Sequence, residues 1–184
     1  MPSSSASQNI FRRFGGNSRG SAVVEFAMVA PVFIALMFAI LETALMFLAS
    51  QVLETINENA ARQIQTGQAQ LANYPDAGTY LQKVVCGQIP ALFACNLISV
   101  DVKSYTSFQN ITISSQIVNG NFDTTTLTYS PGGSCDVVVA RLFYKWPLFV
   151  TSLGYNISNL NGNQRLLVST AAFRNEPFNG ACGS

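Results

Sequence analysis

The sequence has no histidine, and charged residues make up only 10% of its 184 residues. Without histidine, the chain cannot form a Ser-His-Asp or Cys-His catalytic arrangement, or a zinc site with a histidine ligand. Soluble domains usually carry about 25% charged residues, so this low fraction indicates that part of the chain avoids water. The net charge of only +1 argues against the basic face that nucleic-acid binding needs. The composition favours a structural or interaction protein over an enzyme or a nucleic-acid binder.

The first 20 residues are basic and poor in apolar side chains. They contain three arginines and no acid: Arg12, Arg13 and Arg19. Their few apolar residues cannot bury enough surface to offset the entropy of ordering, so we predict that residues 1–20 form a disordered basic leader.

An apolar run without charge extends from Phe26 to Leu41 and, after Glu42 and Thr43, continues to Ala49. As a helix, residues 26–49 would be about 36 Å long at about 1.5 Å per residue, enough to cross a hydrocarbon core of about 30 Å. The alternative is a buried helix of a soluble protein, but a domain of this size rarely encloses so long an apolar helix. We therefore predict a transmembrane span at about residues 26–49.

The arginines set the predicted orientation of this span, because all three precede it. By the positive-inside rule, the N-terminus is cytoplasmic and the rest of the chain lies outside. A cleaved secretory signal is the competing interpretation, but its apolar region is usually about 7–15 residues long and ends in an A-x-A-like site. Ala44 and Ala49 are each preceded, two positions earlier, by a large residue, so ordinary signal peptidase should not remove this segment.

All four cysteines follow the span: Cys86, Cys95, Cys135 and Cys182. An even number of cysteines confined to the translocated part indicates two disulfides in an oxidising compartment such as a bacterial periplasm. Three pairings are possible, and we favour Cys86–Cys95 with Cys135–Cys182. A four-thiolate zinc site is the alternative, which the absence of any C-x-x-C pair disfavours.

Two acids lie at the edges of the apolar run. A carboxylate in hydrocarbon costs about 2.5–3.5 kcal/mol on insertion scales, so Glu25 and Glu42 each need an explanation. For Glu42 we favour a side chain that reaches the outer headgroups. The same explanation is available for Glu25 on the inner side, but the surrounding string, RGSAVVEF over residues 19–26, favours another.

That string resembles the processing site of type IV pilins: a basic leader that ends in glycine, four residues, a glutamate with an aromatic residue, and then an apolar helix. The Glu-aromatic variant is similar to the Flp-type pilins and pseudopilins of tight-adherence (type IVb) pili. Residues 19–47 and 51–68 resemble the TadE-like family of minor pseudopilins, and residues 145–148 and 165–178 do so more loosely. Phe26 replaces the Tyr of the major Flp pilins, which points to a pseudopilin.

The resemblance implies that a membrane prepilin peptidase cuts between Gly20 and Ser21. Ser21 would then be the mature N-terminus and Glu25 its fifth residue. The new amine of a neighbouring subunit could pair with the Glu25 carboxylate and offset its burial. The leader arginines would hold the uncut end at the anionic inner surface.

The remaining sequence predicts an α+β, pilin-like fold in which a long N-terminal helix packs on a small antiparallel sheet. The 3.6-residue periodicity continues the helix to Thr66, with Gly67 as its stop; we assign residues 21–70 to this long-helix region and residues 71–184 to a periplasmic, disulfide-stabilised head. Residues 76–89 predict a second helix with Asp76 as its cap. Alternation and apolar runs predict strands, and turn-forming pairs predict reversals between them. The strands are expected at 98–104, 111–117, 137–146 and 166–173, and the turns at 119–120 and 130–133.

The predicted function is that of a minor pseudopilin in a bacterial inner membrane, with incorporation into an extracellular tight-adherence pilus as one outcome. The implied partners are the prepilin peptidase, other pilins and pseudopilins, the inner-membrane assembly platform and membrane lipid, and no nucleic acid, cofactor or metal. An uncleaved single-pass adaptor of a secretion or pilus apparatus is the alternative. A tethered enzyme has no supporting constellation of residues, so we predict no catalytic site.

Overall fold

The computed structural model describes residues 18–180 and Cys182. They form two compact units, which divide between Leu41 and Glu42. The leader positions 1–17, which include Arg12 and Arg13, lie outside the described residues.

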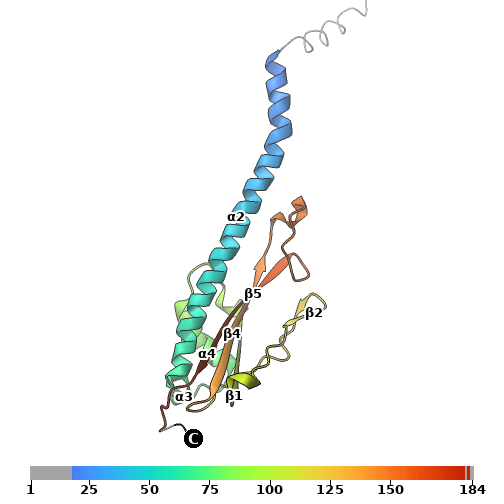
Figure 1. Cartoon of the computed structure of the whole chain (residues 1–184). Coiled ribbons are helices and arrows are strands. Elements are labelled where there is room, and N and C mark those ends of the chain that lie inside the picture. The colour runs from blue at the N-terminus through green and yellow to red at the C-terminus, as the bar shows by residue number, and fades with distance from the viewer. Residues whose placement is uncertain (1–17, 181, 183–184) are drawn as a thin grey trace, which may run out of the picture. The chain divides into compact units, whose positions relative to one another are not determined.

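Helix α2, Ser18–Gln65, is the dominant element (Figure 1) and confirms the long helix predicted from the sequence. It ends because Gly67 adopts a left-handed conformation with φ of 78°, which terminates helices and favours glycine. A side chain at Gly67 would also overlap the ring of Phe178. The short helix α3, Gln68–Leu71, follows directly.

The second unit is built on a three-stranded antiparallel sheet of β1 (Ile98–Tyr105), β4 (Val137–Pro147) and β5 (Gln164–Arg174). The strand order is β1-β4-β5. Strand β4 is central and its first eight residues are all buried, as its apolar run on both faces predicts. Three of the four predicted strands are therefore confirmed.

The second half of α2 packs on this sheet, so the predicted α+β fold is also confirmed. Its buried stripe includes Leu53, Ile56, Ala60 and Ile64, which join the core with apolar residues of β1 and β4. One polar residue, Asn57, lies within the stripe and is 1% exposed. Its amide donates to the Ala140 carbonyl oxygen (3.3 Å) and to the Ser169 hydroxyl (3.1 Å), which links the helix to β4 and β5.

The predicted helix at 76–89 is a succession of short helical turns. These are α4 (Ala77–Tyr80), a π-helical turn (Leu81–Val85) and a 3₁₀ turn (Cys86–Gln88). Asp76 caps the first turn as predicted, because its carboxylate accepts the Thr79 N–H at 2.7 Å. The hydroxyl of Tyr80 donates to the Ala60 carbonyl oxygen at 2.7 Å and so connects this segment to α2. A further 3₁₀ turn, Cys95–Leu97, leads into β1.

The predicted strand at 111–117 is wrong. The position beside β1 is already taken, since Val102 exchanges backbone hydrogen bonds with Thr128 and Ser130, both at 2.8 Å. The carbonyl oxygens of Thr112 and Ser114 accept from the side chains of Tyr105 and Arg141 instead of from a strand. Only Gln116 in this segment is buried, so its alternation of apolar and polar residues does not mark a buried face.

The predicted turn at Asn119–Gly120 is confirmed. It joins β2 (Ile117–Val118) to β3 (Asn121–Phe122), and both turn residues have positive φ, 51° and 73°, as two-residue hairpin turns require. The turn predicted at 130–133 lies later in the chain, where Asp136 N–H donates to the Gly133 carbonyl oxygen at 3.4 Å. Two 3₁₀ turns, Phe108–Asn110 and Val150–Leu153, complete the regular structure.

Candidate functional site

The predicted cleavage bond, Gly20–Ser21, lies in the first turn of α2, together with Arg19. The first four N–H groups of a helix have no acceptor within it, so this turn is the least costly part of α2 to unwind. Gly20 is exposed, and an added Cβ there would meet no atom within 4 Å. The bond is thus sterically open, but a protease that needs an extended substrate must first unwind the turn.

Glu25 and Phe26 follow one helical turn after the predicted bond. The Glu25 side chain is exposed, and the Phe26 ring is 73% exposed. Residues 21 and 25 are four apart and therefore share a helix face. In a membrane, a carboxylate at this position would face lipid or a neighbouring helix.

The first half of α2 presents apolar side chains on every side. Its large apolar residues between Val23 and Leu41 are 42–73% exposed. A helix that is apolar all round is stable only when something outside it covers it, such as lipid. Among the described residues, α2 is the one helix long and apolar enough to cross a membrane.

Glu42 does not reach outwards as predicted. It is 7% exposed, and its carboxylate accepts the backbone N–H groups of Phe149 and Val150, the latter at 3.1 Å. The interpretation as a headgroup-directed side chain is therefore wrong. Its partners are more than a hundred positions away in the sequence, so no local pattern could indicate them.

The segment that Glu42 binds also contacts the next residue of α2, because the Thr43 and Tyr155 hydroxyl groups are 3.2 Å apart. Within it, Leu148 and Val150 are buried, whereas Phe149 is 80% and Tyr155 41% exposed. Among the neighbouring aromatic residues, Tyr144 lies in the core and Trp146 packs against it.

The cysteines pair as favoured from the sequence. Cys86 binds Cys95 and Cys135 binds Cys182, each with a Cα–Cα distance of 5.6 Å. No group of three or more histidine, cysteine, aspartate or glutamate residues that could hold a metal occurs in the described part of the chain.

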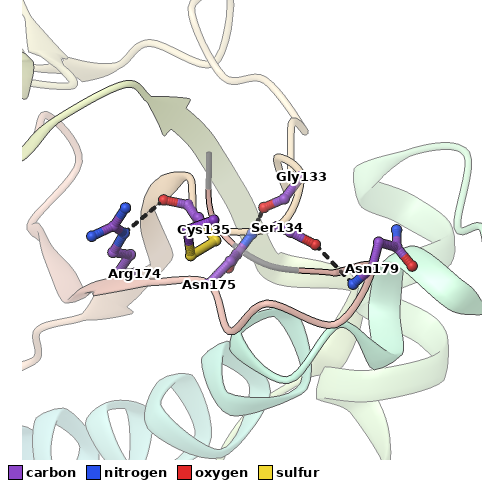
Figure 2. Close-up of a disulfide and its surroundings, with 7 residues drawn as sticks. Gly133, Ser134, Cys135, Arg174, Asn175 and Asn179 are labelled. Atoms are coloured by element: carbon purple, nitrogen blue, oxygen red, sulfur yellow. Dashed lines mark hydrogen bonds between the residues drawn. A yellow bond between two sulfur atoms is a disulfide. The ribbon is translucent and has the colours of Figure 1, made fainter. Parts of the chain in front are cut away.

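The second disulfide closes a C-terminal strap, which we define as residues 174–182 (Figure 2). Arg174 Nε donates to the Cys135 carbonyl oxygen at 2.8 Å, and the Asn175 amide donates to the Gly133 carbonyl oxygen at 2.8 Å. The Asn179 N–H donates to the Ser134 hydroxyl at 3.0 Å. The strap also reaches α2, where Glu176 N–H donates to the Gln65 carbonyl oxygen at 2.8 Å. It therefore joins the end of α2 to the start of β4.

A buried ion pair between Asp101 and Arg141 was not predicted. Their side chains are 1% and 5% exposed and 2.6 Å apart. Asp101 also accepts the Thr128 N–H at 2.8 Å, and Arg141 donates to the Ser114 carbonyl oxygen at 3.1 Å. The pair thus fixes the 112–130 segment to the sheet. The available signal was Arg141, a charged residue inside the apolar run of β4, because a buried charge requires a partner.

Two tyrosines of the head have a raised pKa, and neither can act as an acid or a base near neutral pH. Burial raises the pKa of Tyr129 to about 12, and burial likewise raises the pKa of Tyr80. Both phenols therefore stay protonated at neutral pH.

A groove of about 480 Å³ lies beside Tyr129, between the 75–81 segment and β1. Its one charged lining residue is Asp76, whose carboxylate is occupied by its cap bonds to Thr79. The groove therefore has no convergent set of reactive groups, which an enzyme site needs.

The family model described as TadE-like protein matches residues 20–63. Helix α2 is TadE-like. The match begins at Gly20, beside the predicted cleavage bond, and confirms the resemblance over nearly the whole helix. The family is associated with tight-adherence pili; the match is limited to this helix, and the sheet of the head lies beyond the matched residues. No curated protein and no solved structure matches the chain.

Proposed function

We propose that this chain is a minor pseudopilin of a tight-adherence (Flp, type IVb) pilus. The observation that carries the proposal is the TadE-like match from Gly20 to residue 63, which falls on a helix whose first half is apolar and exposed on every side. Such a helix needs lipid or other helices around it, and a pilin uses both in turn, first in the membrane and then in the fibre.

In this proposal the first half of α2 spans the inner membrane once, with a cytoplasmic leader and a periplasmic head. The arginines before the span support the orientation. The two disulfides support an oxidising compartment for the head. The partners are the prepilin peptidase, other pilins or pseudopilins and the inner-membrane assembly platform.

Cleavage between Gly20 and Ser21 would leave an amine at the start of a helix and the Glu25 carboxylate one turn further on. An ion pair between the amine of one subunit and the carboxylate of another would offset the burial of both charges. We therefore assign Glu25 to assembly rather than to membrane insertion.

The N-terminus of the membrane-extracted full chain tests processing directly. Intact mass spectrometry should find a chain that begins at Ser21 when the prepilin peptidase is co-expressed, and one that begins at Met1 or Pro2 when it is not. A chain with an intact leader in the presence of active peptidase would contradict the proposal.

Glu25→Ala tests the assembly step separately. This variant should insert and be cleaved normally but should not enter fibres, because the buried amine loses its partner. Glu54→Ala is the matched control, since Glu54 is an exposed acid on the same helix. Normal fibre incorporation of Glu25→Ala would remove the pairing role.

An uncleaved inner-membrane adaptor is the second candidate. The position of the Gly20–Ser21 bond within α2 favours it, because a continuous helix is a poor protease substrate until its end unwinds. The same mass measurement decides between the two candidates.

A further inference from the structure

We propose that the outer surface of the membrane lies at Glu42 and that the segment Leu148–Tyr155 rests on it, with Phe149 inserted among the lipid acyl chains. We call the segment Leu148–Tyr155 the membrane-facing loop. The inference rests on the proposed membrane span, but not on cleavage or on fibre assembly.

The burial along α2 places the boundary at Glu42 rather than at Ala49, the end of the predicted span. Met46 and Ala49 are 7% and 0% exposed because the head covers this side of α2, whereas Leu45, Phe47 and Leu48 on its other sides are 50–62% exposed. Glu42 itself is bound to the backbone of the membrane-facing loop, so the head already begins there. Lipid cannot surround a helix where protein packs against it.

The shorter span has the length that a membrane requires. Residues 22–41 form about 30 Å of helix at about 1.5 Å per residue. This equals the thickness of a typical hydrocarbon core, about 30 Å, and about 20 residues is the usual length of a membrane helix.

The backbone of the membrane-facing loop is fixed, and its aromatic side chain points out. Leu148 and Val150 are buried on either side of Phe149, which is 80% exposed. The Leu148 N–H donates to the Asn163 carbonyl oxygen at 2.9 Å, and Glu42 accepts the next two N–H groups. The fixed backbone therefore holds the Phe149 ring in an outward position.

The chemistry of the loop fits a lipid surface. No charged residue occurs between Lys145 and Arg165 in the sequence, so nothing on this stretch opposes entry into the interface. Tyr155 combines an apolar ring with a hydroxyl group that hydrogen-bonds to Thr43. Such amphipathic side chains favour the membrane interface. Backbone N–H groups are costly to leave unpaired near hydrocarbon, and the Glu42 carboxylate pairs two of them at this depth.

The occupant that these observations favour is a phospholipid bilayer, because the loop is bound to Glu42, the residue that follows the last residue of the proposed span in the sequence. A second copy of the chain could also cover an exposed phenylalanine. Fluorescence measured at different protein-to-lipid ratios distinguishes a second copy from lipid.

Fluorescence quenching by brominated phospholipids tests the proposal in the full chain. The native Trp146 is replaced by phenylalanine, and single tryptophans are introduced by Phe149→Trp, Phe33→Trp and Leu71→Trp. Phe33 lies mid-span and reports the span, whereas Leu71, the last residue of α3, is 71% exposed and is the matched control. Each protein is reconstituted in vesicles with bromine either high on the acyl chain or near its end.

We expect the Phe149→Trp protein to lose most of its emission to bromine high on the chain and less to bromine near the end. Phe33→Trp should show the reverse order, and Leu71→Trp should show no quenching. Adding Glu42→Ala to the Phe149→Trp protein should weaken the quenching, because the loop loses its anchor, whereas adding Glu54→Ala should not.

Quenching at position 33 without quenching at position 149 would overturn the membrane-facing loop while the span stands. No quenching at either position would overturn the span and the loop together. A blue shift at position 149 that appears only at high protein-to-lipid ratio would overturn lipid as the occupant and assign the surface to a second copy. If the Trp146→Phe background does not fold, the same comparison is made between Phe149→Trp and the native protein, which has Trp146 alone.

Discussion

The two halves of α2 have the same secondary structure but different surroundings. Before Glu42, side chains such as Phe33 and Leu36 are 62% and 59% exposed, and apolar residues occupy all sides. After it, Leu53 and Ile64 are 1% and 0% exposed, and the opposite face has exposed apolar residues up to Leu48 and charged residues from Glu54 onward. The first half therefore lacks a partner surface within its own compact unit, whereas the second half has the sheet.

The comparison shows that the spacing of apolar residues along a helix, rather than its average hydrophobicity, indicates what covers the helix. A stripe at 3.6-residue spacing marks a helix with one partner face, and a helix that is apolar all round is covered from every side. The change from one pattern to the other falls at Glu42, where the chain also divides into its two units.

The largest expected effect comes from truncating a side chain in the second half. Leu53→Ala should lower the free energy of unfolding of the head by about 2–5 kcal/mol, because it leaves a cavity under the sheet. Leu36→Ala, in the first half, should leave head stability unchanged. Denaturant unfolding in detergent, followed by Trp146 fluorescence, measures both. Equal losses would mean that the two halves share one core.

Removing the second disulfide should affect only the head. Cys135 and Cys182 are 47 positions apart, and the chain-entropy model gives a loss of about 4 kcal/mol when such a link is replaced by two serines. The Cys86–Cys95 link spans 9 positions and should contribute about 3 kcal/mol on the same model. The free energy of unfolding of each double variant measures which disulfide contributes more. Membrane extraction should show that both variants insert normally. Lost insertion would contradict the independence of the halves.

A charge placed in the first half should act on insertion rather than on folding. Ile34→Arg should make membrane insertion less favourable by about 3 kcal/mol, the difference between the two residues at a helix centre. Thr55→Arg, on the exposed face of the second half, is the control and should insert normally. The fraction of each protein that stays in the membrane after carbonate extraction measures its insertion. Equal insertion of both variants would argue against a span.

Smaller effects should separate two neighbouring tyrosines of the head. Tyr80→Phe removes the hydrogen bond to the Ala60 carbonyl oxygen and should cost about 1 kcal/mol of stability. The Tyr129 hydroxyl is buried with no hydrogen-bond partner among the described residues, so Tyr129→Phe should cause no loss. The same unfolding measurement compares them, and a larger loss for Tyr129→Phe would mean that its hydroxyl has a partner.

The two tyrosines also predict how the head responds to high pH. The pKa of Tyr129 rises from 10.0 to about 12 on folding because the ring is buried. The folded state then holds the phenolic proton more tightly than the unfolded chain, so stability is full below pH 10 and falls as the pH rises towards 12. Tyr129→Phe should reduce this decline, and an unchanged decline would assign it to other groups.

Much of the fold could be predicted because its signals are local. The apolar run of residues 26–49 and the 3.6-residue periodicity after it predicted α2. Gly67 predicted its end, Asp76 predicted a cap, and the long apolar run of β4 predicted a central strand. The strand predicted at 111–117 failed because alternation says only that a segment could pair, whereas the position beside β1 is decided by Thr128 and Ser130, further along the chain.

The TadE-like character of residues 20–63 could be recognised in the sequence because its residues are contiguous. The partners of Glu42 could not, since Phe149 and Val150 contribute backbone N–H groups, which every residue except proline has. The pairing of Asp101 with Arg141 could not be predicted either, because it follows from the register of β1 against β4.

The most direct test of the account is a spin-label scan of α2, residue by residue from Ala22 to Ala60, in the full chain reconstituted in lipid vesicles. Accessibility to dissolved oxygen should be high at every position up to Leu41. From Glu42 onward it should oscillate with a period of 3.6 residues, with minima at Met46, Ala49, Leu53 and Ile56. The same oscillation throughout residues 22–41 would show a helix with one buried face, and would contradict a lipid-covered first half.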